Sequence, residues 1–262
     1  MSHMGHPMNK MRFIYKIIPF IVAFSAVFYL FRTSDYYALN ILGASLGGAP
    51  TLYGAIGSMY GLIAAFVINR QWEQWNNLDD AVKSEVDALE RFWLWFNNFP
   101  KETKDKIYGR IRKYLELMIN EGLQLSGDGI RSRAIEDALT SLHKTVYEIC
   151  REDQGLMAPS FSLFADILKS RSDRLKYSGH HVPKLLSGTL VFGVALMVGL
   201  SFFIIIKNVF FDYLFTLGIG TLAFMIFLVV RDLNQPLRPG DWHITTKDYK
   251  DLLKRIDNSR EL

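Results

Sequence analysis

The sequence is poor in the residues that build catalytic, nucleotide-binding or disulfide-bonded sites. Its single cysteine, Cys150, gives no disulfide framework and fits a reducing compartment. It has no Gly-x-Ser-x-Gly motif, no P-loop, no dinucleotide fingerprint and no zinc-like spacing of Cys and His. No segment alternates convincingly between apolar and polar residues, which argues against a sheet. These absences predict a protein that is not an enzyme, holds no metal and uses no cofactor.

Four long segments of the sequence also lack charged residues. The net charge of +4 is too small to indicate nucleic-acid binding. The charge-free runs are long enough to cross or nearly cross a bilayer, and a chain of 262 residues rarely buries four such helices in a soluble core. We therefore expect an all-α membrane protein in which four transmembrane helices carry a cytoplasmic helical bundle. The predicted transmembrane segments are 13–31, 52–69, 185–206 and 213–230.

Basic residues near the ends of these segments predict the orientation. Lys10 and Arg12 precede the first segment, whereas the 33–51 link between the first two contains neither Lys nor Arg. Several basic residues follow the fourth segment. We therefore expect a protein of the inner membrane. Both of its termini and the 70–184 segment are expected on the cytoplasmic side. Residues 1–12 form a tail whose start resembles the remnant of a tag, and residues 231–262 form a cytoplasmic C-terminal tail.

The 70–184 segment has the pattern of amphipathic helices. Apolar residues recur every three or four positions in 72–96, in 107–123 and in 135–149. A fourth helix is expected to follow Pro159. We expect these helices to pack as a bundle on their own transmembrane helices or on neighbouring subunits.

The second transmembrane segment differs from the others because it runs into a charged region at Arg70 without a Gly or Pro break. One helix is therefore expected to leave the membrane and continue into water, as at a pore that opens into a vestibule. Gly54, Gly57 and Gly61 give this helix a small face. That face fits either close helix–helix packing or a narrow pore formed by several copies of the helix.

Acidic residues dominate the continuation of this helix. Two interpretations stay open: a solvated helix face, or the lining of a vestibule that concentrates cations and repels anions. Trp72 and Trp75 are expected to anchor the helix at the membrane exit, because aromatic rings favour the interface. The acids assigned to the vestibule are Glu73, Asp79, Asp80 and Glu85.

Several short motifs resemble the bestrophins. The stretch 70–78 (RQWEQWNNL) is similar to the bestrophin sequence that follows the pore helix, and 234–241 (NQPLRPGD) is similar to an interrupted form of their Asn-Pro-Phe-Gly-acid motif. The stretches 171–175, 182–183 and 232–236 look like those of the prokaryotic bestrophin-like membrane proteins. The likeness covers most of residues 50–245, and the four-span plan with cytoplasmic termini also matches the family.

The resemblance implies a homopentameric channel for small monovalent ions, with five copies of the second helix around the axis. The neck positions of the family fall on Gly54, Ser58 and Leu62, and we add Asn69 as a fourth pore-lining residue. The family typically has bulky apolar residues at the neck, which gate by dewetting, so Gly and Ser here predict a wider and wetter neck. In an alternative register Tyr53, Ile56 and Tyr60 project inward.

Further expectations follow from the resemblance. Only Asp241 stands where eukaryotic bestrophins have a run of acids that binds calcium, so gating of that kind is not expected. Bestrophins are best known as anion channels while bacterial relatives can prefer cations, and the acidic helix weakly favours cations here. We also expect a structural charge pair between Arg174 and an acid such as Asp232 at the cytoplasmic face.

Two other function classes remain. One is a non-conducting membrane scaffold or sensor whose cytoplasmic insert binds a partner. The other is an enzyme or transporter with a site inside the membrane, against which the lack of charge in the second, third and fourth spans argues. Asp212 lies near a membrane boundary and is expected at the interface.

Overall fold

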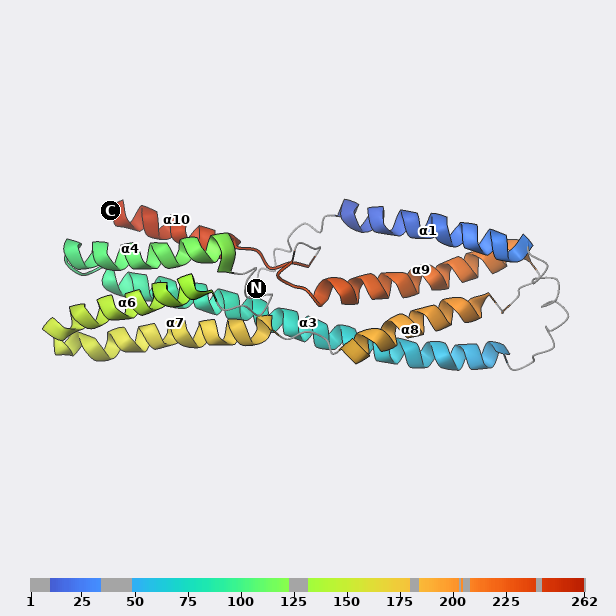
Figure 1. Ribbon diagram of the computed structural model, residues 1–262, viewed down its shortest axis with the longest axis horizontal. Coiled ribbons are helices and arrows are strands. Elements are labelled where there is room, and N and C mark those ends of the chain that lie inside the picture. Colours follow the sequence, from blue (N-terminus) through green and yellow to red (C-terminus); the bar gives the residue numbers. More distant parts are fainter. Residues whose placement is uncertain are drawn as a thin grey trace. The chain divides into compact units, whose positions relative to one another are not determined.

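The computed structural model describes residues 10–33, 49–122, 132–179, 184–202, 204, 208–238 and 242–261, and these contain helices and no strand. The predicted all-α class is confirmed. Figure 1 shows the helices in chain order. Their bounds are α1 (Lys10–Thr33), α3 (Ala49–Phe96), α4 (Lys101–Leu117), the π-helical turn η1 (Met118–Gly122), α6 (Arg133–Glu152), the 3₁₀ turn η2 (Gln154–Leu156), α7 (Met157–Ser178), α8 (Lys184–Ser201), α9 (Val209–Leu233) and α10 (Lys247–Glu261).

The chain forms two compact units. Unit 1 contains residues up to Trp72 together with Val182–Asn234, and therefore holds α1, α8, α9 and the first half of α3. Unit 2 contains Glu73–His181 and Gln235–Leu262, and holds the second half of α3 with α4, α6, α7 and α10. The single helix α3 thus contributes to both units, as predicted from the absence of a break near Arg70.

Unit 1 carries the apolar helices. Three of the described helices are long and apolar enough to cross a membrane, within Tyr15–Thr33, Pro50–Phe96 and Val209–Leu233. The apolar helix Leu185–Ser201 is shorter. Helix α8 ends at Ser201, before the expected end at 206, and residues 205–207 lie outside the described part of the chain. Helices α1 and α9 extend beyond their charge-free cores, since charged residues at helix ends do not interrupt the backbone hydrogen bonds.

Aromatic packing joins α1 to α9 inside unit 1. Phe20 stacks on Phe224 with ring centroids 4.2 Å apart, and the ring of Phe24 lies against Gly220. Where α1 ends and α9 begins, the guanidinium of Arg32 forms an ion pair with the carboxylate of Asp212, which is buried. Asp212 is therefore paired inside the protein, and that partner was not predicted.

A second contact within unit 1 joins α3 to α8. Ala64 and Val67 of α3 form a small buried cluster with Leu190 of α8 and Val230 of α9. Beside this cluster the ring of Tyr60 lies on Gly193, where a Cβ atom would approach the ring to 2.5 Å. The absence of a side chain at residue 193 therefore sets how closely α3 and α8 approach.

Unit 2 has one hydrophobic core, as the apolar periodicity predicted. Residues from α3, α4, α6 and α7 fill it, and Leu89, Phe92, Ile111 and Leu142 are fully buried. Pro159 lies in the first turn of α7, where a missing backbone N–H costs no helical hydrogen bond.

Helix α10 also belongs to this core, although residues 231–262 were expected to form only a C-terminal tail. Tyr249, Leu252 and Ile256 are fully or almost fully buried and lie on one helical face. Their spacing of three and four residues was the signal that could have identified this helix. It was obscured because Lys and Asp occupy most of the positions between them.

We predict that Gly193→Ala destabilises the α3–α8 contact by about 1–3 kcal/mol, because the new methyl group overlaps the ring of Tyr60. The matched control is Gly199→Ala in the same helix, where a Cβ atom meets nothing within 4 Å. Thermal unfolding of the two purified variants in detergent measures the difference. Equal unfolding temperatures for the two variants would contradict the prediction.

Candidate functional site

The membrane half of α3 uses one side to pack against its own chain. Tyr53 donates a hydrogen bond from its hydroxyl to the backbone oxygen of Met197, 3.3 Å away, and Gly57 lies under the side chain of the same methionine. Tyr60 packs on Gly193. The alternative register had Tyr53 and Tyr60 facing a pore, whereas both side chains lie against α8.

The predicted pore-lining residues share a different side of α3. Gly54, Ser58, Leu62 and Asn69 are all exposed in the chain, and Leu62 is 73% exposed. On an ideal helix they fall within about 80° of one another. The hydroxyl of Ser58 donates to the backbone oxygen of Gly54 at 2.9 Å, so it is satisfied within its own helix. A continuous face of small and polar residues therefore remains uncovered by the described part of the chain.

A second exposed face of α3 lies beside the first and has the opposite character. Leu52, Met59, Ile63 and Phe66 are exposed and bulky. On an ideal helix they centre about 100–110° away from the small and polar residues. Helix α3 therefore carries two uncovered faces. Only the face of bulky residues has the apolar composition that favours contact with lipid or with an apolar neighbour.

In unit 2 the predicted vestibule acids divide into three kinds. Glu73 and Asp80 are exposed, as a vestibule lining requires. Asp79 is half-buried and accepts a hydrogen bond from the Lys83 amino group at 2.5 Å, which offsets its charge locally. The assignment of Glu85 to the vestibule is wrong, because its side chain is fully buried in the core of unit 2.

Glu85 is buried because three donors from three other helices converge on its carboxylate. Arg174 of α7 donates from Nε to Oε2 at 2.5 Å, and Tyr249 of α10 donates its hydroxyl to the same oxygen at 2.9 Å. Tyr114 of α4 donates its hydroxyl to Oε1. Arg174 also lies 3.6 Å from the sulfur of Met118, at the start of the π-helical turn. One carboxylate therefore links α3, α4, α7 and α10.

The ionisation of the donors reflects this environment. Burial raises the pKa values of Tyr114 and Tyr249 well above the ordinary value, and the negative charge of Glu85 raises them further, so both remain protonated donors. Burial alone opposes the charge on Arg174, yet its pKa is raised because the carboxylate of Glu85 favours the charged form. The cluster thus holds one compensated ion pair and two neutral phenols.

The expected pairing of Arg174 with Asp232 stays a prediction, because the two residues belong to different units. Glu85 is the partner that the structure gives to Arg174. The sequence offered no signal for it, since Glu85 lies 89 residues away in a helix with several other acids.

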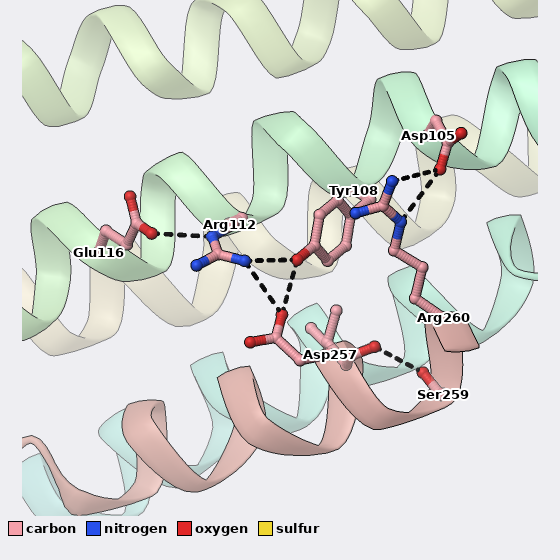
Figure 2. A network of polar contacts seen from close by, with 8 residues as sticks. Asp105, Tyr108, Arg112, Glu116, Asp257, Ser259 and Arg260 are labelled. Atoms are coloured by element: carbon pink, nitrogen blue, oxygen red, sulfur yellow. Dashed lines mark hydrogen bonds and ion pairs between the residues drawn. The ribbon is translucent and has the colours of Figure 1, made fainter. Parts of the chain in front are cut away.

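A second polar network fixes α10 to α4 at the surface of unit 2 (Figure 2). The hydroxyl of Tyr108 donates to Asp257 at 2.8 Å and accepts from Arg112 at 2.6 Å. The guanidinium of Arg260 lies over the Tyr108 ring, 4.3 Å from its centroid, and pairs with Asp105 at 3.1 Å. Contacts to its hydroxyl and to its ring face therefore fix Tyr108, and the same contacts attach the last turns of α10 to α4.

The two tryptophans expected at the membrane exit have different surroundings. Trp72 is 38% exposed, in agreement with an interfacial position, but the position itself remains a prediction. Trp75 is half-buried, and its Nε1 donates to the backbone oxygen of Trp242 at 3.0 Å. Trp75 therefore binds the segment that precedes α10. In the described residues, no group of three or more His, Cys, Asp or Glu side chains is placed to hold a metal ion.

The apolar helices of unit 1, one of which continues into the helical unit 2, define an all-α membrane protein. The chain belongs to the bestrophin-like family, because the Bestrophin-like domain matches residues 48–246. The resemblance stated from the motifs is thereby confirmed. Proteins of the bestrophin family are known as ion channels, which supports a channel-like function.

Solved structures agree on the fold. A bacterial bestrophin homologue from Klebsiella pneumoniae with a tyrosine-to-alanine substitution is similar, with a TM-score of 0.77, 11% identity, and coverage of 94% of this chain and 100% of that one. A structure of the homologue phased with zinc gives a TM-score of 0.76 at 10% identity over 95% and 98% of the two chains. At such identities the likeness shows the fold alone. No curated protein matches the chain.

We predict that Glu85→Ala destabilises unit 2 by about 3–5 kcal/mol, because it leaves the charge of Arg174 buried without its partner. Tyr249→Phe removes one hydrogen bond and costs about 1 kcal/mol. Thermal unfolding followed by helical circular dichroism measures both. Glu148→Ala, which removes an exposed acid from α6, is the control and is expected to stay within about 0.5 kcal/mol of the parent. A loss in the control as large as that of Glu85→Ala would refute the assignment.

Proposed function

We propose that the chain forms a homopentameric channel that conducts small monovalent ions, with a weak preference for cations, through an axial pore lined by α3. The observation that carries the proposal is the uncovered face of Gly54, Ser58, Leu62 and Asn69 on a helix of a bestrophin-like protein. The family and its ion-channel character support this assignment.

Such a face is stable only where its polar groups find partners. Lipid hydrocarbon offers no partner to the Asn69 amide, and polar side chains within a membrane usually face the interior of a bundle or water. Placed around an axis, five copies would turn this face toward water and the bulky residues toward neighbouring helices or lipid. Gly54 and Ser58 then give a wide, wettable neck, and Leu62 is the one bulky apolar residue that could narrow it and gate by dewetting.

The charge on the continuing part of α3 supports a cation preference. Glu73 and Asp80 are exposed there, and Lys83 opposes Asp80 on the same side of the helix. Glu85 contributes nothing to this surface because it is buried and paired, so the preference is weaker than the count of acids indicates. A cation preference of this kind arises from local concentration in the field of the vestibule and falls with ionic strength.

The basic residues at the membrane ends support an orientation with unit 2 and both termini in the cytoplasm. In this orientation, ions that pass the α3 neck would meet Glu73 and Asp80 on the cytoplasmic side. The apolar helices support a multi-pass protein, for which we propose the inner membrane as the location.

We predict that a cysteine at residue 58 is accessible from the pore. In bilayers that hold the Ser58→Cys variant, a cationic methanethiosulfonate reagent should reduce the current by about half or more, because the added group obstructs the neck. The neighbouring Met59→Cys variant is the control, since Met59 lies on the bulky face. The single native cysteine is buried and leaves the background silent. Block in Met59→Cys but not in Ser58→Cys would mean that the register is wrong.

We predict that the purified protein in a KCl gradient gives a current that reverses nearer the potassium than the chloride potential. Asp80→Lys should move the reversal toward the chloride potential, because it inverts the charge beside the permeating ion. Glu102→Lys, which changes an exposed acid on α4, should leave the reversal in place. Reversal of the parent near the chloride potential would keep the channel and overturn the cation preference. Silence at good incorporation would favour the scaffold.

A further inference from the structure

Unit 2 carries an open groove between α3 and α7 that the proposed function does not use. Its volume is about 330 Å³, and both helices contribute charged side chains to it. Ser84, Asp87 and Arg91 line it from α3, and Asp166, Lys169 and Asp173 line it from α7. All of these residues belong to unit 2.

The charges in this groove are incompletely compensated. Arg91 and Asp166 form an ion pair across it at 3.6 Å. Asp87 and Asp173 form no ion pair or side-chain hydrogen bond within the described part of the chain, although Asp173 is half-buried. Leu94, one turn after Arg91 on the same side of α3, is 53% exposed. The surface therefore combines acids that lack a partner in the described part of the chain with an apolar side chain in water.

A complementary surface lies on α4 of the same unit. Lys106, Arg110 and Lys113 are exposed and follow one another at spacings of four and three residues, which places them in one stripe. Lys106 is paired with Glu102 at 2.7 Å. Arg110 and Lys113 form no ion pair or side-chain hydrogen bond in the described residues. Ile107, Ile111 and Leu115 occupy the buried side of α4, so the stripe is turned away from the core.

We infer that the α3–α7 groove binds the basic stripe of α4 from a second copy of this chain. This inference rests on the oligomer in the proposed function. Arg110 and Lys113 of one copy would neutralise Asp87 and Asp173 of the next, and the contact would cover Leu94. The two surfaces differ, so the interface is head-to-tail. Such a contact closes into a ring when its rotation divides a full turn.

The composition of the groove favours this occupant over a free cation or an anionic headgroup. The described residues offer no group of three metal-binding side chains, so the groove does not fit a free metal ion. Asp87 and Asp173 repel an anion. A helix that brings two basic side chains on a fixed spacing can reach the two acids while leaving the internal Arg91–Asp166 pair intact.

The first test is a directed cross-link between two differently tagged chains that are expressed together. One chain carries Arg110→Cys and the other Asp173→Cys, so a disulfide between the tags can only form between copies. We expect a covalent heterodimer under mild oxidation. The control replaces Arg110→Cys by Lys144→Cys, an exposed position on α6, and should give none. Absence of the first product while native mass spectrometry shows an intact oligomer would overturn the inference, as would equal yields from both pairs.

The second test uses charge reversal and its rescue. Asp87→Lys with Asp173→Lys should weaken subunit association about tenfold, and so should Arg110→Glu with Lys113→Glu. The chain with all four substitutions should recover most of the oligomer, because each reversed charge again faces an opposite one. Additive losses in the fourfold variant would refute the pairing. If the parent protein conducts ions and assembles while these tests fail, only the inferred interface is wrong. If the parent protein is monomeric and conducts no ions, the proposed channel function is wrong as well.

Discussion

The fold of unit 2 depends on one buried ion pair, between Glu85 and Arg174. Neither side chain reaches solvent, so each charge must be met inside the protein, and a carboxylate that lost its donors there would cost several kcal/mol. Tyr114 and Tyr249 supply the remaining hydrogen bonds. Four helices are thereby constrained to meet at one point, and the core of leucine, isoleucine and phenylalanine packs around it. The C-terminal helix is held by the same carboxylate and by the surface network around Tyr108.

Local sequence patterns, which extend over a few residues, predicted much of this structure. Contacts between residues far apart in the sequence were not predicted. Charge-free runs identified the apolar helices, and apolar periodicity identified α4, α6 and α7. The partners of Glu85 lie 29, 89 and 164 residues away, beyond the range of any local pattern. Glu85 was therefore grouped with Asp80 and Glu73 by its charge, while its burial depended on residues in other helices. The pore face was predicted from spacing and resemblance, and the chain leaves it uncovered.

The resemblance to solved bestrophin homologues extends over nearly the whole chain at about a tenth identity. A fold can persist at that level because it needs apolar runs, helix lengths and a few close approaches, such as Gly193 under Tyr60, more than it needs particular side chains. Conduction depends on the individual residues of one face. In the proposed channel, Gly54 and Ser58 would therefore bear on which ions pass and how the pore closes, while leaving the architecture unchanged.

The uninterrupted course of α3 makes its length as important as its composition. On an ideal helix Glu85 lies about half a turn from Ser58, so one end of the helix can face a core while the other presents its small face. Inserting or deleting a single residue between them would rotate one end by about 100° relative to the other. Adding seven residues would change the angle by only about 20°. The segment 62–84 is therefore restricted to changes in length that preserve whole turns, in addition to the limits that its buried residues Ala64, Val67, Leu78 and Val82 set on composition.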